Sequence, residues 1–267
     1  MIRVGAVNYL NTKPLIEGLT GFAPTIDLSL ELPSRLADRL AENQLDVGLI
    51  PVIEFFRAKH YRVIPNCSIS SHGPVLSVTL FSRVPWNAIR SVSLDEGSRT
   101  SAALTKILLH ENGPIDYRQL PIERPADGVE TDALLLIGDR AMKACLPGFE
   151  CSFDLGQLWF ERTGLPMVFA VWAVRPDVEL GDAATAFEKA KKLGLSRAGA
   201  IAQREALILN LDAGYCRRYF DTIIRYDLGE AELAGLRRYY REAVALGLAP
   251  EGVELVREYR SHPVACR

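Results

Sequence analysis

Residues 2–50 read IRVGAVNYLNTKPLIEGLTGFAPTIDLSLELPSRLADRLAENQLDVGLI, and apolar runs alternate with amphipathic stretches along them. Runs typical of strands and stretches typical of helices follow one another at residues 2–7, 12–19, 25–31, 35–45 and 47–50. Ser34 stands where a cap is expected for the second helical stretch. This alternation predicts a parallel sheet with right-handed crossovers and with helices on both faces.

A second alternating series begins near Ser91 and predicts a smaller lobe. Its expected strands lie at residues 92–94, 115–120 and 133–137, and its expected helices lie at residues 100–111 and from Arg140 on. The strands expected at residues 76–82 and 169–175 flank this series and are predicted to be hinges. Later helices are expected at residues 183–193, 196–209, 215–225, 230–246 and 252–259.

Composition and charge exclude several classes of protein. The chain has 267 residues, of which 48% are hydrophobic and 24% charged, as in globular domains and unlike collagen, coiled coils or disordered chains. Lys plus Arg number 31 and Asp plus Glu number 33, so the net charge of -2 offers no basic field for nucleic acid. The apolar runs are far shorter than the roughly 20 residues of a membrane span. We therefore expect neither nucleic acid nor a membrane as a partner.

The start of the chain and its cysteines favour a cytoplasmic location. Asn8 interrupts the first apolar run, and no small-residue cleavage site follows, so no signal peptide is expected. The five cysteines are scattered without a CxxC pair, which suits a reducing compartment and gives no metal-ligand spacing. The sequence also contains no GxGxxG, GxxxxGK, GxSxG or HExxH motif. A structural role is favoured for the four isolated histidines, but His72, which adjoins Gly73 and Pro74 near an expected hinge, keeps a catalytic alternative open.

Polar residues gather after three expected strands, where α/β sheets bind ligands. Asn8, Tyr9, Asn11 and Thr12 follow the first strand, and both a helix-capping cluster and a substrate-binding floor explain them. Residues 97–101, GSRTS, open an expected helix, where free N–H groups, the helix dipole and the hydroxyls favour a carboxylate or phosphate site. After the strand at residues 133–137 come Gly138 and Asp139, and there a helix cap by Asp139 is favoured over a binding role.

An ordered series of motifs resembles the chorismate dehydratase family, the first enzyme of the futalosine route to menaquinone. The motifs are VGAVNYLNTKPL at 4–15, DVGLIPVIEF at 46–55, HGPVLSVTLFSR at 72–83, SLDEGSRTS at 93–101, LLLIGDRA at 134–141 and GLPMVFAVW at 164–172. With helical sequence of suitable length after them, the resemblance covers essentially the whole chain.

The resemblance implies a fold similar to type II periplasmic binding proteins. Such a fold is α/β, with two parallel or mixed sheets flanked by helices, joined by hinge strands and followed by a helical C-terminus. Lobe one would comprise residues 1–84 and 172–267, and lobe two would be inserted as residues 85–171, with the substrate cleft between them. The implied reaction converts chorismate to 3-[(1-carboxyvinyl)oxy]benzoate and water, without metal or organic cofactor. No obligate protein partner is evident from the sequence.

The resemblance also implies site residues. Asn11 and Ser77 match the family's functional asparagine and serine, and the proposed base is the substrate's own enolpyruvyl carboxylate. We expect Asn11 to orient that carboxylate and the leaving hydroxyl, and Ser77 to bind substrate across the hinge. The ring carboxylate is assigned to the hydroxyls at the start of the expected helix at residues 100–111, where Arg99 can instead point outward. The expected substrate-binding residues are Tyr9, Gly73, Pro74, Ser98, Arg99, Thr100, Ser101, Gly138 and Asp139.

Two other functions stay open on the sequence. A carboxylate-binding module without turnover would use the same fold, because fold does not dictate function. The later synthase of the same pathway relies on a catalytic histidine, and His72 is the histidine placed for such a role.

Overall fold

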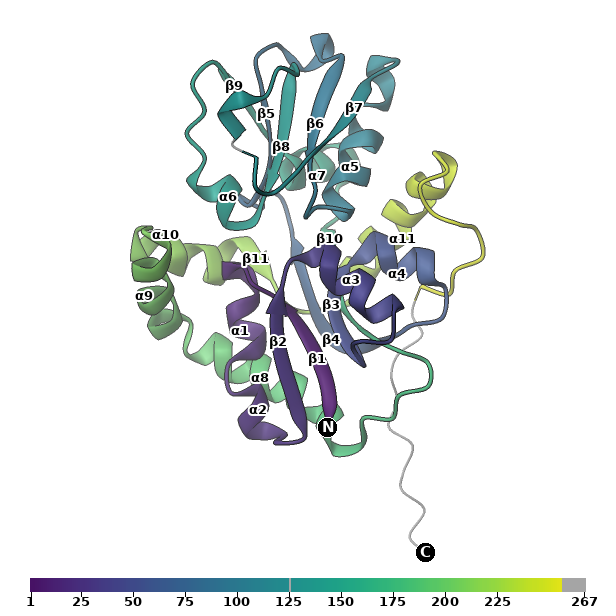
Figure 1. Ribbon diagram of the computed structural model, residues 1–267, viewed down its shortest axis with the longest axis vertical. Coiled ribbons are helices and arrows are strands. Elements are labelled where there is room, and N and C mark those ends of the chain that lie inside the picture. Colours follow the sequence, from purple (N-terminus) through teal and green to yellow (C-terminus); the bar gives the residue numbers. More distant parts are fainter. Residues whose placement is uncertain (125, 256–267) are drawn as a thin grey trace, which may run out of the picture.

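The computed structural model describes residues 1–124 and 126–255, and these form two lobes, each built on a mixed sheet (Figure 1). In the lower lobe, the described residues form a six-stranded sheet in the order β11-β4-β10-β3-β1-β2. Its strands are β1 (Ile2–Val7), β2 (Ile26–Glu31), β3 (Val47–Pro51), β4 (Arg62–Ser71), β10 (Met167–Val174) and β11 (Ile224–Arg225). As the alternation predicted, β1 is parallel to β2 and β3, whereas β10 is antiparallel to β3 and β4.

The upper lobe holds a five-stranded sheet among the described residues, in the order β7-β6-β8-β5-β9. Its strands are β5 (Val78–Ser82), β6 (Ser91–Asp95), β7 (Asp116–Leu120), β8 (Ala133–Ile137) and β9 (Cys151–Asp154). β6 runs parallel to β7 and β8, while β5 runs antiparallel to β8 and β9. The two mixed sheets and their flanking helices confirm the predicted two-lobed α/β class.

Helices cover both sheets. In Figure 1, α1, α2 and α8 lie on one side of the lower sheet, and α3, α4 and α11 lie on the other. The helices are α1 (Lys13–Ile16), α2 (Leu19–Phe22), α3 (Pro33–Ala41), α4 (Val52–Ala58), α5 (Thr100–Leu108), α6 (Gly138–Lys143), α7 (Leu155–Thr163), α8 (Ala184–Ser196), α9 (Ala198–Leu209), α10 (Ala213–Arg218) and α11 (Glu230–Ala245). Within the described residues, no helix is long and apolar enough to cross a membrane.

The chain crosses between the lobes at residues 72–77 and again at residues 164–166. The strands predicted as hinges lie beside these crossings, because β5 pairs on both sides within the upper sheet and β10 pairs on both sides within the lower one. The two crossings therefore lie a few residues earlier in the chain than the strands expected to be hinges. We propose that the lobe limits follow the sheets, at the two crossings, in place of residues 84 and 172.

Strand β4 was not predicted, although it pairs with both β10 and β11. Its sequence, RVIPNCSISS, contains a proline and several serines, which are unusual in a buried strand. The serine hydroxyls are buried at little cost because they donate to backbone carbonyls. Ser68 donates to the carbonyl of Asp227 at 2.6 Å, and Ser70 donates to that of Arg225 at 3.2 Å.

Three local predictions were wrong. The helix expected at residues 12–19 is divided, because Gly18 adopts a φ of 72° between α1 and α2. Ser34 does not cap α3, which begins one residue earlier at Pro33, a residue that favours the first turn of a helix. Of the helix expected at residues 252–259, residues 252–255 are not helical, and the remainder lies outside the described residues.

Candidate active site

A cavity with about 520 Å³ of space, part of it open to solvent, lies between the two sheets. Eight of the residues predicted from the sequence line it, namely Tyr9, Asn11, Ser77, Ser98, Arg99, Thr100, Ser101 and Gly138. Apolar residues, including Ile69, Val75, Ile137 and Phe169, supply most of the remaining wall. A mainly apolar cavity with a few convergent polar groups is the usual form of a small-molecule site.

The carboxyl ends of three strands place the polar residues at the cavity. Tyr9 and Asn11 follow β1, residues 98–101 follow β6, and Gly138 follows β8. Ser77 reaches the same space from the first crossing, immediately before β5. The rule that ligands bind at the carboxyl ends of strands therefore accounts for most of this lining.

Ser77 is joined to a residue that sequence reasoning missed. The Tyr219 hydroxyl donates a hydrogen bond to Ser77 Oγ at 2.7 Å, and both side chains are buried. Asn11, which is half-buried, accepts a hydrogen bond from Thr12 Oγ1 at 3.3 Å on its carbonyl oxygen. Tyr219 is 142 residues from Ser77 in the chain, and no motif or spacing marks it.

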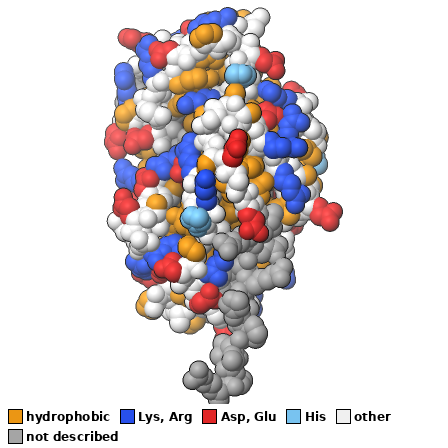
Figure 2. Space-filling view, turned by 90° about the vertical axis from the view of Figure 1, so that its right-hand side faces the viewer, with side chains coloured by type: hydrophobic (Ala, Val, Ile, Leu, Met, Phe, Trp, Pro, Cys, Tyr) orange, Lys and Arg blue, Asp and Glu red, His pale blue; other side chains and the backbone are white. Residues whose placement is uncertain are grey.

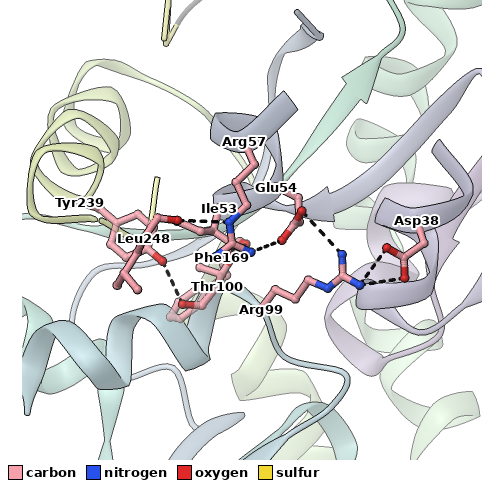
Figure 3. Close-up of polar contacts among 9 residues, drawn as sticks. All are labelled: Asp38, Ile53, Glu54, Arg57, Arg99, Thr100, Phe169, Tyr239 and Leu248. Carbon is pink, nitrogen blue, oxygen red and sulfur yellow. Dashed lines mark hydrogen bonds and ion pairs between the residues drawn. The ribbon is translucent and has the colours of Figure 1, made fainter. Parts of the chain in front are cut away.

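The hydroxyls around the start of α5 have different partners. Ser98 Oγ is buried and has no hydrogen-bond partner. The Thr100 hydroxyl instead donates to the carbonyl of Phe169 at 3.0 Å, and the Tyr239 hydroxyl donates to the carbonyl of Thr100 at 2.9 Å (Figure 3). Thr100 thus links the upper lobe to β10 and α11, whereas the Ser98 hydroxyl is free to bind a ligand.

The Arg99 guanidinium is directed toward Asp38 and Glu54 of the lower lobe (Figure 3). Its Nη2 lies 2.8 Å from both carboxylate oxygens of Asp38 on α3, and its Nη1 lies 3.6 Å from Glu54 on α4. Both carboxylates belong to the lower lobe, so Arg99 forms an ion pair between the lobes. This arrangement is the outward orientation that the sequence left open.

On the opposite side of the cavity, Gly138 packs against Tyr9. Gly138 has a φ of 58°, and a Cβ added there would lie 2.6 Å from the Tyr9 ring, so only glycine fits this contact. The favoured prediction of a helix cap by Asp139 was wrong. Asp139 Oδ1 instead accepts a hydrogen bond across the lobes from the backbone N–H of Leu10 at 3.0 Å. Burial raises the pKa of Asp139, although the hydrogen bond from Leu10 acts to lower it.

Asp95 braces the loop that leads into α5. Its carboxylate is buried, accepts a hydrogen bond from the Gly97 N–H at 2.9 Å and forms an ion pair with Arg140 at 3.1 Å. Burial raises the pKa of Asp95, and Arg140 opposes that rise. Burial also raises the pKa of Tyr9, so that phenol stays protonated at neutral pH.

The other residues predicted from the sequence lie outside the cavity lining. Gly73 and Pro74 belong to the first crossing, and His72 is exposed there with its ring centroid 4.7 Å from that of Phe160. Among the described residues that line the cavity, none carries an imidazole, an amine or a carboxylate. Nor does the described part of the chain bring together three or more His, Cys, Asp or Glu residues that could hold a metal ion. The site therefore offers hydroxyls, an amide and backbone N–H groups as its polar contacts.

The molecular surface carries both signs of charge. Figure 2 shows Lys and Arg side chains interspersed with Asp and Glu side chains over the face that it presents. That face has no extended basic patch of the kind that a nucleic-acid backbone requires.

Comparison with known proteins identifies one family and two relatives that share a name. Residues 2–245 match the model of a family described as menaquinone biosynthesis. A chorismate dehydratase of Thermus thermophilus is 34% identical over 273 residues, covering 92% of this chain and 96% of that protein. A chorismate dehydratase of Campylobacter jejuni is 27% identical, covering 92% of this chain and 99% of that protein.

Solved structures share the fold at low sequence identity. A protein of Archaeoglobus fulgidus has a TM-score of 0.75 at 19% identity, covering 92% of this chain and 98% of its own. The periplasmic aliphatic sulphonate binding protein of Escherichia coli has a TM-score of 0.67 at 17% identity, covering 100% of this chain and 94% of its own. The predicted periplasmic-binding-protein-like fold is therefore confirmed.

Proposed function

This chain belongs to the menaquinone biosynthesis family, and we propose that it is a chorismate dehydratase, a hydro-lyase that converts chorismate to 3-[(1-carboxyvinyl)oxy]benzoate and water. Two curated relatives with this name, each aligned over 92% of the chain, support the reaction. The observation on the structure that carries the proposal is the cavity between the lobes. Asn11, Ser77 and the unpartnered hydroxyl of Ser98 all belong to its lining.

The chemistry of chorismate explains why neutral groups suffice. The ring C–H beside the enolpyruvyl ether is vinylogous to the ring carboxylate, so its removal gives a delocalised dienolate. The dienolate then expels the neighbouring hydroxyl, and the ring becomes aromatic, which drives the reaction. The protein has to hold the geometry and stabilise the negative charge as it spreads.

No imidazole, amine or carboxylate stands in the described cavity lining to take a proton, which supports the substrate as its own base. In this mechanism the enolpyruvyl carboxylate takes the ring proton. The bond between the ring and the neighbouring hydroxyl then breaks, and that hydroxyl leaves as water with the same proton. Asn11 orients the carboxylate and the leaving hydroxyl, and Ser77 donates a hydrogen bond to the substrate. The N-terminus of α5, with Ser98 and Ser101, receives the ring carboxylate.

The two alternative functions are less well supported. The later synthase would need a catalytic histidine, but His72 is exposed and makes an edge-to-face contact with Phe160 outside the cavity. A carboxylate-binding module would use the same cavity without turnover. A direct assay of chorismate dehydration distinguishes this binding module from a dehydratase.

We expect the purified chain to convert chorismate to a product lighter by one water, with the rate unchanged after dialysis against a chelator. Liquid chromatography with mass spectrometry identifies the product and follows its formation. Recovery of intact chorismate from a preparation that circular dichroism shows to be folded would overturn the dehydratase. Tight binding of chorismate without turnover would then identify a binding module.

Replacing Ser98 with alanine separates substrate binding from stability. If Ser98 Oγ binds the ring carboxylate, Ser98→Ala raises the KM for chorismate about tenfold, because a hydrogen bond to a charged group is lost. The free protein should keep or slightly gain stability, because the lost hydroxyl is buried without a partner.

Ser93→Ala is the matched control, since Ser93 Oγ is buried and accepts a hydrogen bond from Thr131 Oγ1 at 2.9 Å away from the cavity. This variant should lose stability and keep its KM. Steady-state kinetics and thermal unfolding measure both properties, and an unchanged KM in Ser98→Ala would contradict the assignment.

A further inference from the structure

Tyr219 lies directly behind Ser77, outside the lining of the cavity. It opens the π-helical turn Tyr219–Ile223, which follows α10, and its side chain is 1% exposed. π-helical turns are rare and often occur at functional sites, where the wider turn changes the direction of a side chain. Here the turn directs the phenol from the C-terminal helices to the first crossing.

The hydrogen bond between the two hydroxyls has a direction. A serine hydroxyl donates one hydrogen and accepts through two lone pairs. Because Tyr219 donates to Ser77 Oγ at 2.7 Å, the Ser77 hydrogen has to find another acceptor. In the structure it faces the carbonyl of Val75 at 3.4 Å, longer than the usual 2.5–3.0 Å of an O–H···O bond. The Ser77 hydrogen is therefore weakly held and available to a ligand in the cavity.

The surroundings of Tyr219 keep its phenol a donor. Burial raises the pKa of Tyr219 far above neutral pH, so the phenol remains protonated. Hydrogen bonds with Ser77 and with the Asn11 side chain act in the opposite sense. The phenol therefore stays the hydrogen-bond donor to Ser77, one of the two residues to which the proposed function assigns catalysis.

We propose that Tyr219 is a positioning residue, which fixes Ser77 as a hydrogen-bond donor to the substrate. This inference rests on the proposed dehydratase function. It extends the site to Tyr219, a residue of the C-terminal helical segment that does not itself line the cavity. Without the phenol, the Ser77 hydroxyl would be free to turn and to accept instead of donate.

Tyr219→Phe removes the phenol oxygen alone. We expect kcat for chorismate dehydration to fall about tenfold, as expected for one lost hydrogen bond, while KM changes less than about threefold. The matched control is Tyr226→Phe, because the Tyr226 hydroxyl is also buried but has no hydrogen-bond partner. That control should keep the kcat and KM of the wild type. Thermal unfolding of each variant shows that the assay temperature lies below its transition.

The Ser77→Ala background tests whether Tyr219 acts through Ser77. If it does, adding Tyr219→Phe to Ser77→Ala lowers kcat less than about twofold further, because residues that act as a unit are not additive. A merely structural loss would lower kcat by the same factor in both backgrounds, and that result would overturn the proposal. So would a Tyr219→Phe variant with the kcat of Tyr226→Phe. A wild-type chain that does not dehydrate chorismate would instead overturn the proposed function, and the inference with it.

Discussion

Ser77→Ala is expected to lower kcat for chorismate dehydration by about 10²–10³-fold, the effect of removing one donor from a site of developing negative charge. Ser77 lines the cavity and its hydroxyl is held by Tyr219, so alanine removes a group already aimed at the substrate. KM should change little if the bond strengthens mainly as the dienolate forms. Steady-state kinetics with product detection by mass spectrometry measures both constants.

Ser82→Ala is the control for this variant. Ser82 stands at the end of β5, is as buried as Ser77, and donates to the carbonyl of Val84 at 2.7 Å. Its replacement should cost stability without changing kcat, because it lies at the end of the strand away from the cavity. Equal kcat values for the two alanine variants would remove Ser77 from the catalytic group.

Local sequence patterns could predict the residues that follow strands. Asn11, Ser98 and Gly138 each stand just beyond an apolar strand, and the topology of the sheets brings these positions to one cavity. The family resemblance added Ser77, which stands before a strand and not after one. This part of the site follows from short-range patterning combined with the rule for α/β sheets.

Contacts across the lobes could not be predicted in the same way. Tyr219 meets Ser77 at the first crossing, and Asp139 meets Leu10 and Arg99 meets Asp38 across the two lobes. Asp139 illustrates the physical reason. An acidic residue at the start of a helix predicts a cap, but a partner from the other lobe occupies its carboxylate. Helix-capping propensity reflects only hydrogen bonds with neighbouring residues in the chain, so it does not predict partners that are distant in sequence.

The Asp154 carboxylate organises the crossing that carries Ser77. It accepts hydrogen bonds from the backbone N–H groups of Val75 at 3.0 Å and Leu76 at 2.7 Å, and it caps α7 through the N–H of Gln157 at 3.0 Å. Leu76 has a φ of 60°, which is unfavourable for a leucine. The carboxylate thus holds the residue before Ser77 in a conformation that the chain would otherwise leave. Burial raises the pKa of Asp154, although the backbone N–H groups oppose that rise.

Asp154→Asn is therefore expected to lower kcat by about 10²-fold, because a misplacement of about 1 Å in a catalytic group has an effect of that order. The asparagine has nearly the same shape, but its NH₂ group cannot accept a hydrogen bond, so at least one backbone N–H loses its acceptor. Stability should fall by about 2 kcal/mol, the typical cost of losing a hydrogen bond to a charged group. Urea unfolding and steady-state kinetics measure the two effects.

Asp132→Asn separates stability from positioning. Asp132 Oδ2 also accepts two backbone hydrogen bonds, from Arg90 and Ser91, both at 2.8 Å, but it lies at the end of the upper sheet away from the cavity. This variant should lose stability in the same way and keep the kcat of the wild type. If both asparagine variants kept wild-type kcat, the conformation of Leu76 would not control Ser77. If both lost activity equally, the loss would reflect weakened folding of the upper lobe and not the position of Ser77.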